Sequence, residues 1–264
     1  MLKKLLKYDM KWCLKVVSIY VIIGLVLAVL GRLIDLFPES VFFSVVGGIC
    51  KGASISFGIT AIVNAIIRAW VRMITNMYKD ESYLTHTLPI KIDKIYLSKI
   101  ISSITLVIIC IITLLISLII MYLNDSTIEL IKTSLNIISD NLELSITGIV
   151  ILMTLLIILQ IINIILCGFV GIIFGHSYNN KKVAMMLLYG FGSYVVIQIV
   201  NVIILMGTSL FNSDLYNILF NGVETVEFSL LKGITIFCII IYSIISFVLY
   251  YFSNKKLLKG INID

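Results

Sequence analysis

The sequence IISSITLVIICIITLLISLIIMYL, residues 100–123, is an unbroken apolar run without a single charged side chain. An α-helix needs about 20 apolar residues to cross the ~30 Å hydrocarbon core of a bilayer. Only helices and closed barrels satisfy their backbone hydrogen bonds in lipid, and a barrel strand would alternate apolar and polar residues. This run therefore predicts a membrane-spanning helix.

Five further runs of the same kind occur along the chain. They cover residues 16–37, 41–67, 144–174, 183–206 and 232–252. The whole sequence is 60% hydrophobic and only 13% charged, with a mean hydropathy of +1.13, which is far more apolar than a soluble domain. We therefore expect an all-α integral membrane protein with six transmembrane helices, forming a single transmembrane domain over residues 1–264.

The distribution of positive charge predicts the orientation. Most of the 20 Lys and Arg residues fall in residues 1–15, 68–99 and 176–182 and at the C-terminal end. Loops on the cytoplasmic side of a membrane carry an excess of Lys and Arg. Both termini are therefore predicted to be cytoplasmic, and the net charge of +6 indicates orientation and not nucleic acid binding.

Three segments outside the predicted spans have a composition of their own. Residues 1–15 carry five lysines among leucines and a tryptophan. This pattern predicts an amphipathic interfacial helix held by anionic membrane lipid, or simple flanking charge. Residues 68–99 form the longest polar loop. Residues 207–231 form a moderately apolar outer segment that is too interrupted by asparagine, aspartate and glycine to cross the membrane.

Motifs of known enzyme classes are absent from the sequence. It contains no G-x-x-x-x-G-K-[ST] phosphate loop, no H-E-x-x-H, no G-x-S-x-G and no paired carboxylates at mid-membrane depth. The five cysteines are scattered singly, and His86 and His176 fall in predicted loops without neighbouring ligands. We therefore expect no enzyme activity, no metal site and no cofactor in this chain.

Amide side chains recur at helical spacing inside the predicted spans. Gln160 and Asn163 share one face of the fourth span, and Gln198 and Asn201 share one face of the fifth. A short turn joins these spans, so the two pairs should meet. They predict either an interhelical amide clasp, which we favour because amides carry no charge, or the polar lining of a substrate path. Asn64 in the second span allows the same two interpretations.

Two G-x-x-x-G spacings allow helices to approach each other closely. They are Gly48–Gly52 in the second span and Gly171–Gly175 in the fourth. We expect them to pack helices within one chain, and the second span is the better candidate if either forms a dimer seam. Lys51 lies near Asp35 at the outer ends of the first two spans, where we expect a local ion pair.

The stretch ESYLTHTLPIKIDKIYLSK, residues 81–99, resembles the coupling segment of type-2 ABC exporter permeases. In that family an acid-led Y-L-T-x-T-L-P motif is followed by a basic run and an S-K pair before the third helix. The matching residues here are Glu81, Tyr83, Leu84, Thr85, Thr87, Leu88, Pro89, Ser98 and Lys99. The sequence departs from the family pattern at Ser82 and His86. The six-span layout, the basic N-terminal segment and the re-entrant outer segment expected over residues 207–231 extend the resemblance to the full chain.

The resemblance implies the permease subunit of an ABC exporter. It implies two copies of a separate ATP-binding subunit, which would bind ATP and Mg²⁺ and receive the 80–99 loop, and a second permease copy or paralogue. Relatives move antimicrobial peptides, lipids, polysaccharides or drugs. The usage of isoleucine, lysine and asparagine suggests a bacterial plasma membrane. The alternative is a stand-alone membrane immunity or interaction protein that binds a peptide without an ATPase.

Overall fold

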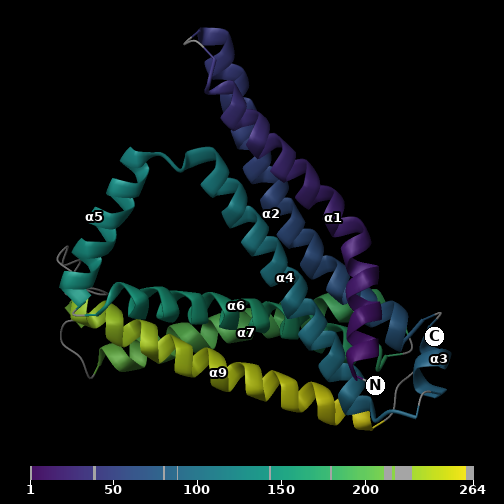
Figure 1. The fold of residues 1–264 in the computed structure, drawn as a ribbon. Helices are drawn as coiled ribbons and strands as arrows, with labels where there is room; N and C mark the ends of the chain where they lie inside the picture. Colours follow the sequence, from purple (N-terminus) through teal and green to yellow (C-terminus); the bar gives the residue numbers. More distant parts are fainter. Residues whose placement is uncertain are drawn as a thin grey trace. The chain divides into compact units, whose positions relative to one another are not determined.

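The computed structural model describes residues 2–37, 40–79, 81–87, 89–142, 144–178, 180–210, 216–217 and 228–259. Within these residues every regular element is an α-helix, which confirms the predicted all-α class. The helices are α1 (Leu2–Ile34), α2 (Val41–Met77), α3 (Ser82–Thr87), α4 (Ile92–Tyr122), α5 (Asp125–Leu142), α6 (Ile146–Gly175), α7 (Lys182–Ser209) and α9 (Phe228–Leu258) (Figure 1).

Six of the described helices are long and apolar enough to cross a membrane, namely α1, α2, α4, α6, α7 and α9. The shortest of their apolar segments has 27 residues, which at about 1.5 Å per residue exceeds the ~30 Å hydrocarbon core. The prediction of six helices long and apolar enough to span a membrane is confirmed, and this supports a multi-pass membrane protein. The amphipathic α5 and the six-residue α3 are not among the membrane helices.

The central helices extend beyond their predicted spans. α2 continues to Met77 and α4 already begins at Ile92, so the polar loop expected over residues 68–99 is much shorter and contains α3. Arg72 and Lys99, whose charges suggested a loop, lie inside α2 and α4 and are buried. Their charges are tolerated in these helices because each has a carboxylate partner, as described below.

The N-terminal segment is not a separate interfacial helix. α1 is continuous from Leu2 to Ile34, and its 33 residues extend about 50 Å, so one helix includes both the basic segment and the predicted span. Asp9, Cys13 and Val17 are buried at four-residue spacing, which places one face of this segment against its neighbours. The five lysines of residues 1–15 remain exposed. Most of the outer segment predicted over residues 207–231 lies outside the described residues.

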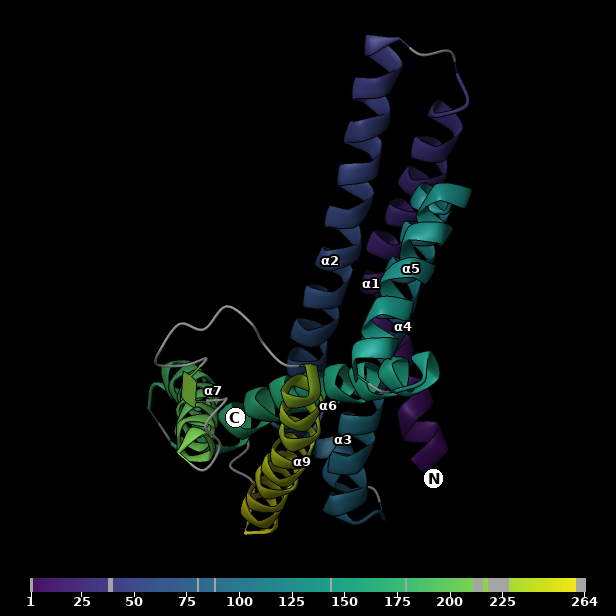
Figure 2. The same ribbon diagram turned by 90° about the vertical axis from the view of Figure 1, so that its left-hand side faces the viewer.

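Residues up to Glu129 form one compact unit built on an antiparallel hairpin. α1 and α2 run side by side over their length, and α4 packs against both (Figures 1 and 2). Ala61, Ala65 and Ala69 form a buried stripe on α2 that allows close helix packing. Ser54 Oγ donates a hydrogen bond to the Gly24 carbonyl at 2.7 Å and links the hairpin near its middle.

Residues from Leu130 onward form a second unit, in which α6 packs against α7 and α9. The α6 and α7 backbones approach closely at Gly171 and Gly175. A Cβ added at Gly171 would lie 2.7 Å from the Gly190 Cα, and one at Gly175 would lie 2.6 Å from the Met186 nitrogen. The prediction that this G-x-x-x-G spacing packs helices within one chain is therefore confirmed.

The second G-x-x-x-G spacing behaves differently. A Cβ added at Gly48 or Gly52 would meet no described atom within 4 Å. The two glycines thus lie on an open face of α2 and pack no described helix of this chain.

We expect Gly175→Ala to lower the unfolding temperature, because its Cβ would displace the α7 backbone. Gly52→Ala is the matched control and should be neutral or slightly stabilising, since alanine favours a helix over glycine by up to ~1 kcal/mol. Thermal unfolding of the purified chain in detergent measures both. An equal loss of stability in the two variants would contradict the difference in packing.

Candidate functional site

α3 is a short helix held between the ends of α2 and α4. The Ser82 amide donates to the Lys79 carbonyl at 2.7 Å and the Thr85 amide to the Glu81 carbonyl at 3.0 Å, which turns the chain into the helix. Pro89 follows just after α3 and favours its termination. α3 packs against α2, so the sequence between two membrane helices folds into a short element at their end.

α3 has a buried polar face and an exposed apolar face. Ser82 and Thr85 are buried, whereas the side chains of Tyr83 and Leu84 are 68% and 73% exposed. Of the other residues predicted to contact an ATPase, Thr87 and Pro89 are exposed and Leu88 lies outside the described residues. The described part of the predicted motif therefore presents two adjacent apolar side chains to the surroundings.

Glu81 anchors the start of α3 to α2. Arg72 Nη1 donates to its two carboxylate oxygens at 2.8 and 2.7 Å, and Asn76 Nδ2 donates to Oε2 at 3.0 Å. Partial burial raises the pKa of Glu81, but these hydrogen bonds and the positive charges of Arg72 and Lys99 outweigh it and hold the pKa below its ordinary value. Glu81 is thus a carboxylate at neutral pH.

Arg72 also links α2 to α1 through Asp9. Its Nε donates to Asp9 Oδ1 at 2.9 Å, and Lys99 Nζ of α4 lies 2.6 Å from the same oxygen. Ser98 Oγ donates to Asp9 Oδ2 at 3.3 Å. Asp9 and Lys99 are each 2% exposed and Arg72 is 8% exposed. We call Asp9, Arg72, Glu81 and Lys99 the charged cluster.

The charged cluster is neutral as a whole and joins three membrane helices to the turn that starts α3. Moving a charge into a protein interior costs several kcal/mol unless it is paired, and removing one partner of a buried pair typically costs ~3–5 kcal/mol. The planar fork of Arg72 suits it to bind two carboxylates at once. The arrangement therefore fixes the position of α3 relative to the start of α1, the end of α2 and the start of α4.

Trp12 adds a second link between α1 and α2 at this end. Its ring centroid lies 5.4 Å from the Arg72 guanidinium carbon and 5.5 Å from that of Arg68. Arginines at this distance from an indole ring are attracted by its π system. Trp12 therefore helps to hold the Arg72 side chain in the position from which it reaches both carboxylates.

Sequence analysis missed Asp9 and Arg72 as site residues. Lys99 and Glu81 belong to the motif-like stretch, but their partners lie on other helices. The available signal was that Asp9 is the one acid among the five lysines of residues 1–15. An acid in an otherwise basic segment, four residues before Cys13 and eight before Val17, lies on the apolar face of that helix.

The amides predicted to meet in α6 and α7 form a second polar site. Gln160, Asn163 and Gln198 line one pocket of about 140 Å³ together with Tyr194 of α7 and Tyr242 of α9. A pocket of this size holds a few water molecules of ~30 Å³ each and is smaller than the ~300–1,000 Å³ of typical small-molecule sites.

The hydrogen bonds of these amides run to α9 and not between the two pairs. Asn163 Nδ2 donates to the Tyr242 carbonyl at 3.2 Å and to Ser246 Oγ at 3.0 Å, and Asn201 Nδ2 donates to the Tyr242 hydroxyl at 3.4 Å. Among the described residues, no hydrogen bond joins the α6 amides to the α7 amides, and Asn163 and Asn201 both bond to α9 instead. Asn64 donates only to the Thr60 carbonyl of its own helix, at 2.9 Å.

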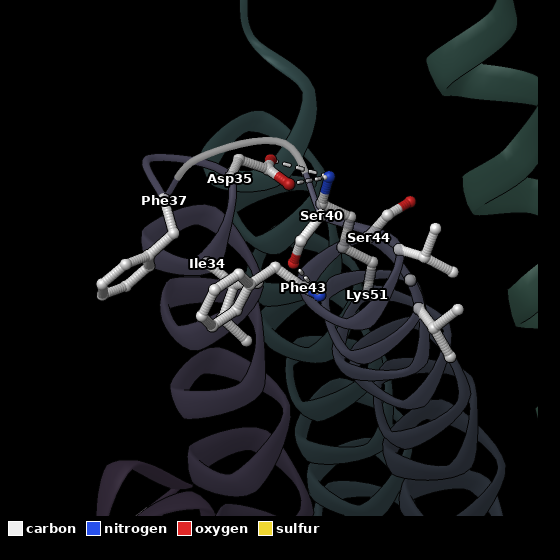
Figure 3. A pocket seen from close by; sticks show the side chains of 10 residues that line it. Ile34, Asp35, Phe37, Ser40, Phe43, Ser44 and Lys51 are labelled. Carbon is white, nitrogen blue, oxygen red and sulfur yellow. Dashed lines mark hydrogen bonds and ion pairs between the residues drawn. The ribbon is translucent and has the colours of Figure 1, made fainter.

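A larger open cleft of about 630 Å³ lies at the tip of the α1–α2 hairpin (Figure 3). Lys51 Nζ lies 2.7 Å from Asp35 Oδ2 there, which confirms the predicted ion pair. The rings of Phe37 and Phe43 stack with centroids 5.2 Å apart beside it. Among the described residues that line this cleft, the two charged side chains are paired with each other.

We expect Glu81→Gln to lower the unfolding temperature at neutral pH, since Arg72 would lose its carboxylate partner. A lowered folded pKa means that the charge of Glu81 stabilises the protein fully above the ordinary pKa of about 4.3 and ceases to do so as the pH falls through the folded pKa. The difference in unfolding temperature between wild type and variant should be constant from about pH 8 to about pH 5 and shrink below about pH 4. A difference that is independent of pH would rule out the charge as the link.

We expect Asn163→Leu to destabilise the second unit by ~1 kcal/mol, because the α6–α9 hydrogen bonds would be lost in a membrane-embedded interface. Asn64→Leu is the control and should leave stability unchanged, as Asn64 bonds only its own helix. Equilibrium unfolding in mixed detergent and denaturant compares the two variants with wild type. Equal effects would show that the interhelical bonds of Asn163 contribute nothing.

Neither a metal centre nor a known relative points to the function of this chain. Among the described residues, no group of three His, Cys, Asp or Glu side chains could hold a metal ion. Comparisons with protein families, with curated proteins and with solved structures found no match. The function is therefore inferred from the contacts of the chain itself.

Proposed function

We propose that this chain is the permease subunit of a bacterial ABC exporter and that α3 is its coupling helix. The observation that carries the proposal is the combination found at α3. An exposed apolar pair, Tyr83 and Leu84, lies on a six-residue helix whose start is bonded by Glu81 to the end of α2 and, through Arg72, to the charged cluster. A partner that binds this pair would act directly on those helices.

The shape of α3 suits a mechanical contact. A helix of six residues is too short to be stable on its own in water, so its position depends on what it is packed and bonded to. The charged cluster provides that attachment at three membrane helices. On this proposal a soluble ATPase receives Tyr83 and Leu84 in a groove, and closure of the ATPase dimer shifts α3 and with it α1, α2 and α4.

The charge pattern supports a cytoplasmic position for α3, as coupling to an ATPase requires. The N-terminal end of α1, with its exposed lysines, lies at the same end of the first unit as α3 (Figure 1). Loops on the cytoplasmic side of bacterial membranes are enriched in Lys and Arg. We therefore propose cytoplasmic termini in a bacterial plasma membrane.

The proposal assigns ATP hydrolysis to other chains. The sequence lacks the G-x-x-x-x-G-K-[ST] phosphate loop, so two copies of a separate ATP-binding subunit would bind ATP and Mg²⁺. A second permease copy or paralogue would complete the exporter. The pocket at Gln160, Asn163 and Gln198 stays a candidate for part of the substrate path, and its small volume agrees with a closed state of such a path.

The test is co-purification with the ATP-binding protein encoded beside this chain. Detergent-solubilised wild type, Tyr83→Asp and Leu84→Asp are compared with Leu258→Asp as a matched control, because Leu258 is an exposed leucine (58%) near a helix end outside the first unit. We expect the ATPase to co-purify with wild type and control, and its recovery to fall at least about tenfold in the α3 variants, since a buried charge without a partner costs several kcal/mol at an interface.

Two results would count against the proposal. If the ATPase bound equally to wild type and to the α3 variants, α3 would not be its docking element. If no ATPase bound to the folded wild type, a stand-alone membrane immunity or interaction protein would become the better explanation.

A further inference from the structure

We propose that Asp9 is a positioning residue for α3, although among the described residues no hydrogen bond or ion pair joins the two directly. The connection is Arg72, whose Nε binds Asp9 while its Nη1 binds Glu81 at the start of α3. The proposal deepens the proposed function, because its purpose rests on α3 being the coupling helix. Its physical content, that α3 responds to a change on α1, holds or fails without any partner.

The geometry leaves Arg72 little freedom of its own. The guanidinium is planar, so the direction of Nε fixes the direction of Nη1. Asp9 and Glu81 bind the same guanidinium through different nitrogens, at 2.9 and 2.7 Å. Loss of the Asp9 carboxylate would let the guanidinium turn about Glu81 and would loosen the start of α3, which Asn76 Nδ2 and the Thr75 carbonyl would still bond to α2.

Losing Asp9 should affect α3 more than the loss of one hydrogen bond would, because it also unbalances the charges of the cluster. Without Asp9, the cluster would contain two cations and one anion, and Lys99 would be left 2% exposed without its carboxylate at 2.6 Å. Glu81 is the remaining carboxylate of the cluster, so Lys99 and Arg72 would compete for it. The competition changes the attachment of α3, which begins directly after Glu81.

Asp9 is also where the three long helices of the first unit meet. Its two oxygens accept from Arg72 of α2 and from Ser98 and Lys99 of α4, while the residue itself belongs to α1. A displacement of α3 that is passed to Arg72 therefore reaches α1 and α4 through one carboxylate. Asp9 thus couples a displacement of α3 to α1, α2 and α4.

The test is amide hydrogen exchange, followed by mass spectrometry, on the full chain in detergent without any partner protein. We expect Asp9→Asn to speed exchange of the α3 amides about tenfold, together with the first turns of α1. Asp9→Asn combined with Lys99→Met should bring α3 exchange back towards wild type, because a neutral Arg72–Glu81 pair remains. Asp35→Asn, which breaks the ion pair at the hairpin tip, is the matched control and should leave α3 unchanged.

A milder variant covers the case in which Asp9→Asn unfolds the chain. Ser98→Ala removes only the hydrogen bond to Asp9 Oδ2 and should speed α3 exchange about threefold, with α7 unaffected. Unchanged α3 exchange in a folded Asp9→Asn chain, or in Ser98→Ala where Asp9→Asn does not fold, would overturn the proposal. No ATPase takes part in the exchange experiment, so its result does not depend on whether an ATPase co-purifies with the chain. A failure of this proposal can therefore be told apart from a failure of the proposed function.

Discussion

The buried carboxylate of Asp9 is the interaction on which the first unit depends. It lies between the guanidinium of Arg72 and the ammonium of Lys99, so it neutralises charges from two other helices at a depth where each would otherwise be unfavourable. Its presence explains why α2 and α4 remain helical beyond the apolar spans. The carboxylate also bonds the basic segment of α1 to α2 and α4 on one face, where α1 continues without a break.

The two units are stabilised by different kinds of contact. The first unit combines small-residue packing along the α1–α2 hairpin with ionic bonds at the end that carries α3. In the second unit, α6 and α7 meet at glycines, and the polar bonds described between its long helices come from neutral amides and hydroxyls. Charges respond strongly to displacement in a low dielectric, whereas close glycine packing resists it. On the proposed function, a partner would therefore act on the first unit through its charged cluster.

Sequence analysis predicted the contacts of individual residues correctly where these contacts depend on nearby sequence. The ion pair of Lys51 and Asp35 was predicted because the two residues lie near each other at the ends of neighbouring spans. The close packing at Gly171 and Gly175 was predicted because glycine itself allows helices to approach. It failed for Asn163, whose acceptors on α9 are 79 and 83 residues away. It also took Arg72 and Lys99 for loop residues, because an unpaired charge normally marks the end of a membrane helix.

The sequence by itself determined the all-α class and the number of helices long enough to cross a membrane. Hydropathy is summed over about 20 neighbouring residues, so it does not depend on the rest of the fold. Only the tertiary structure decided which charge meets which. Asp9 is 63 residues from Arg72 and 90 from Lys99, and a buried ion pair depends on distances of a few ångströms that no spacing along the chain encodes.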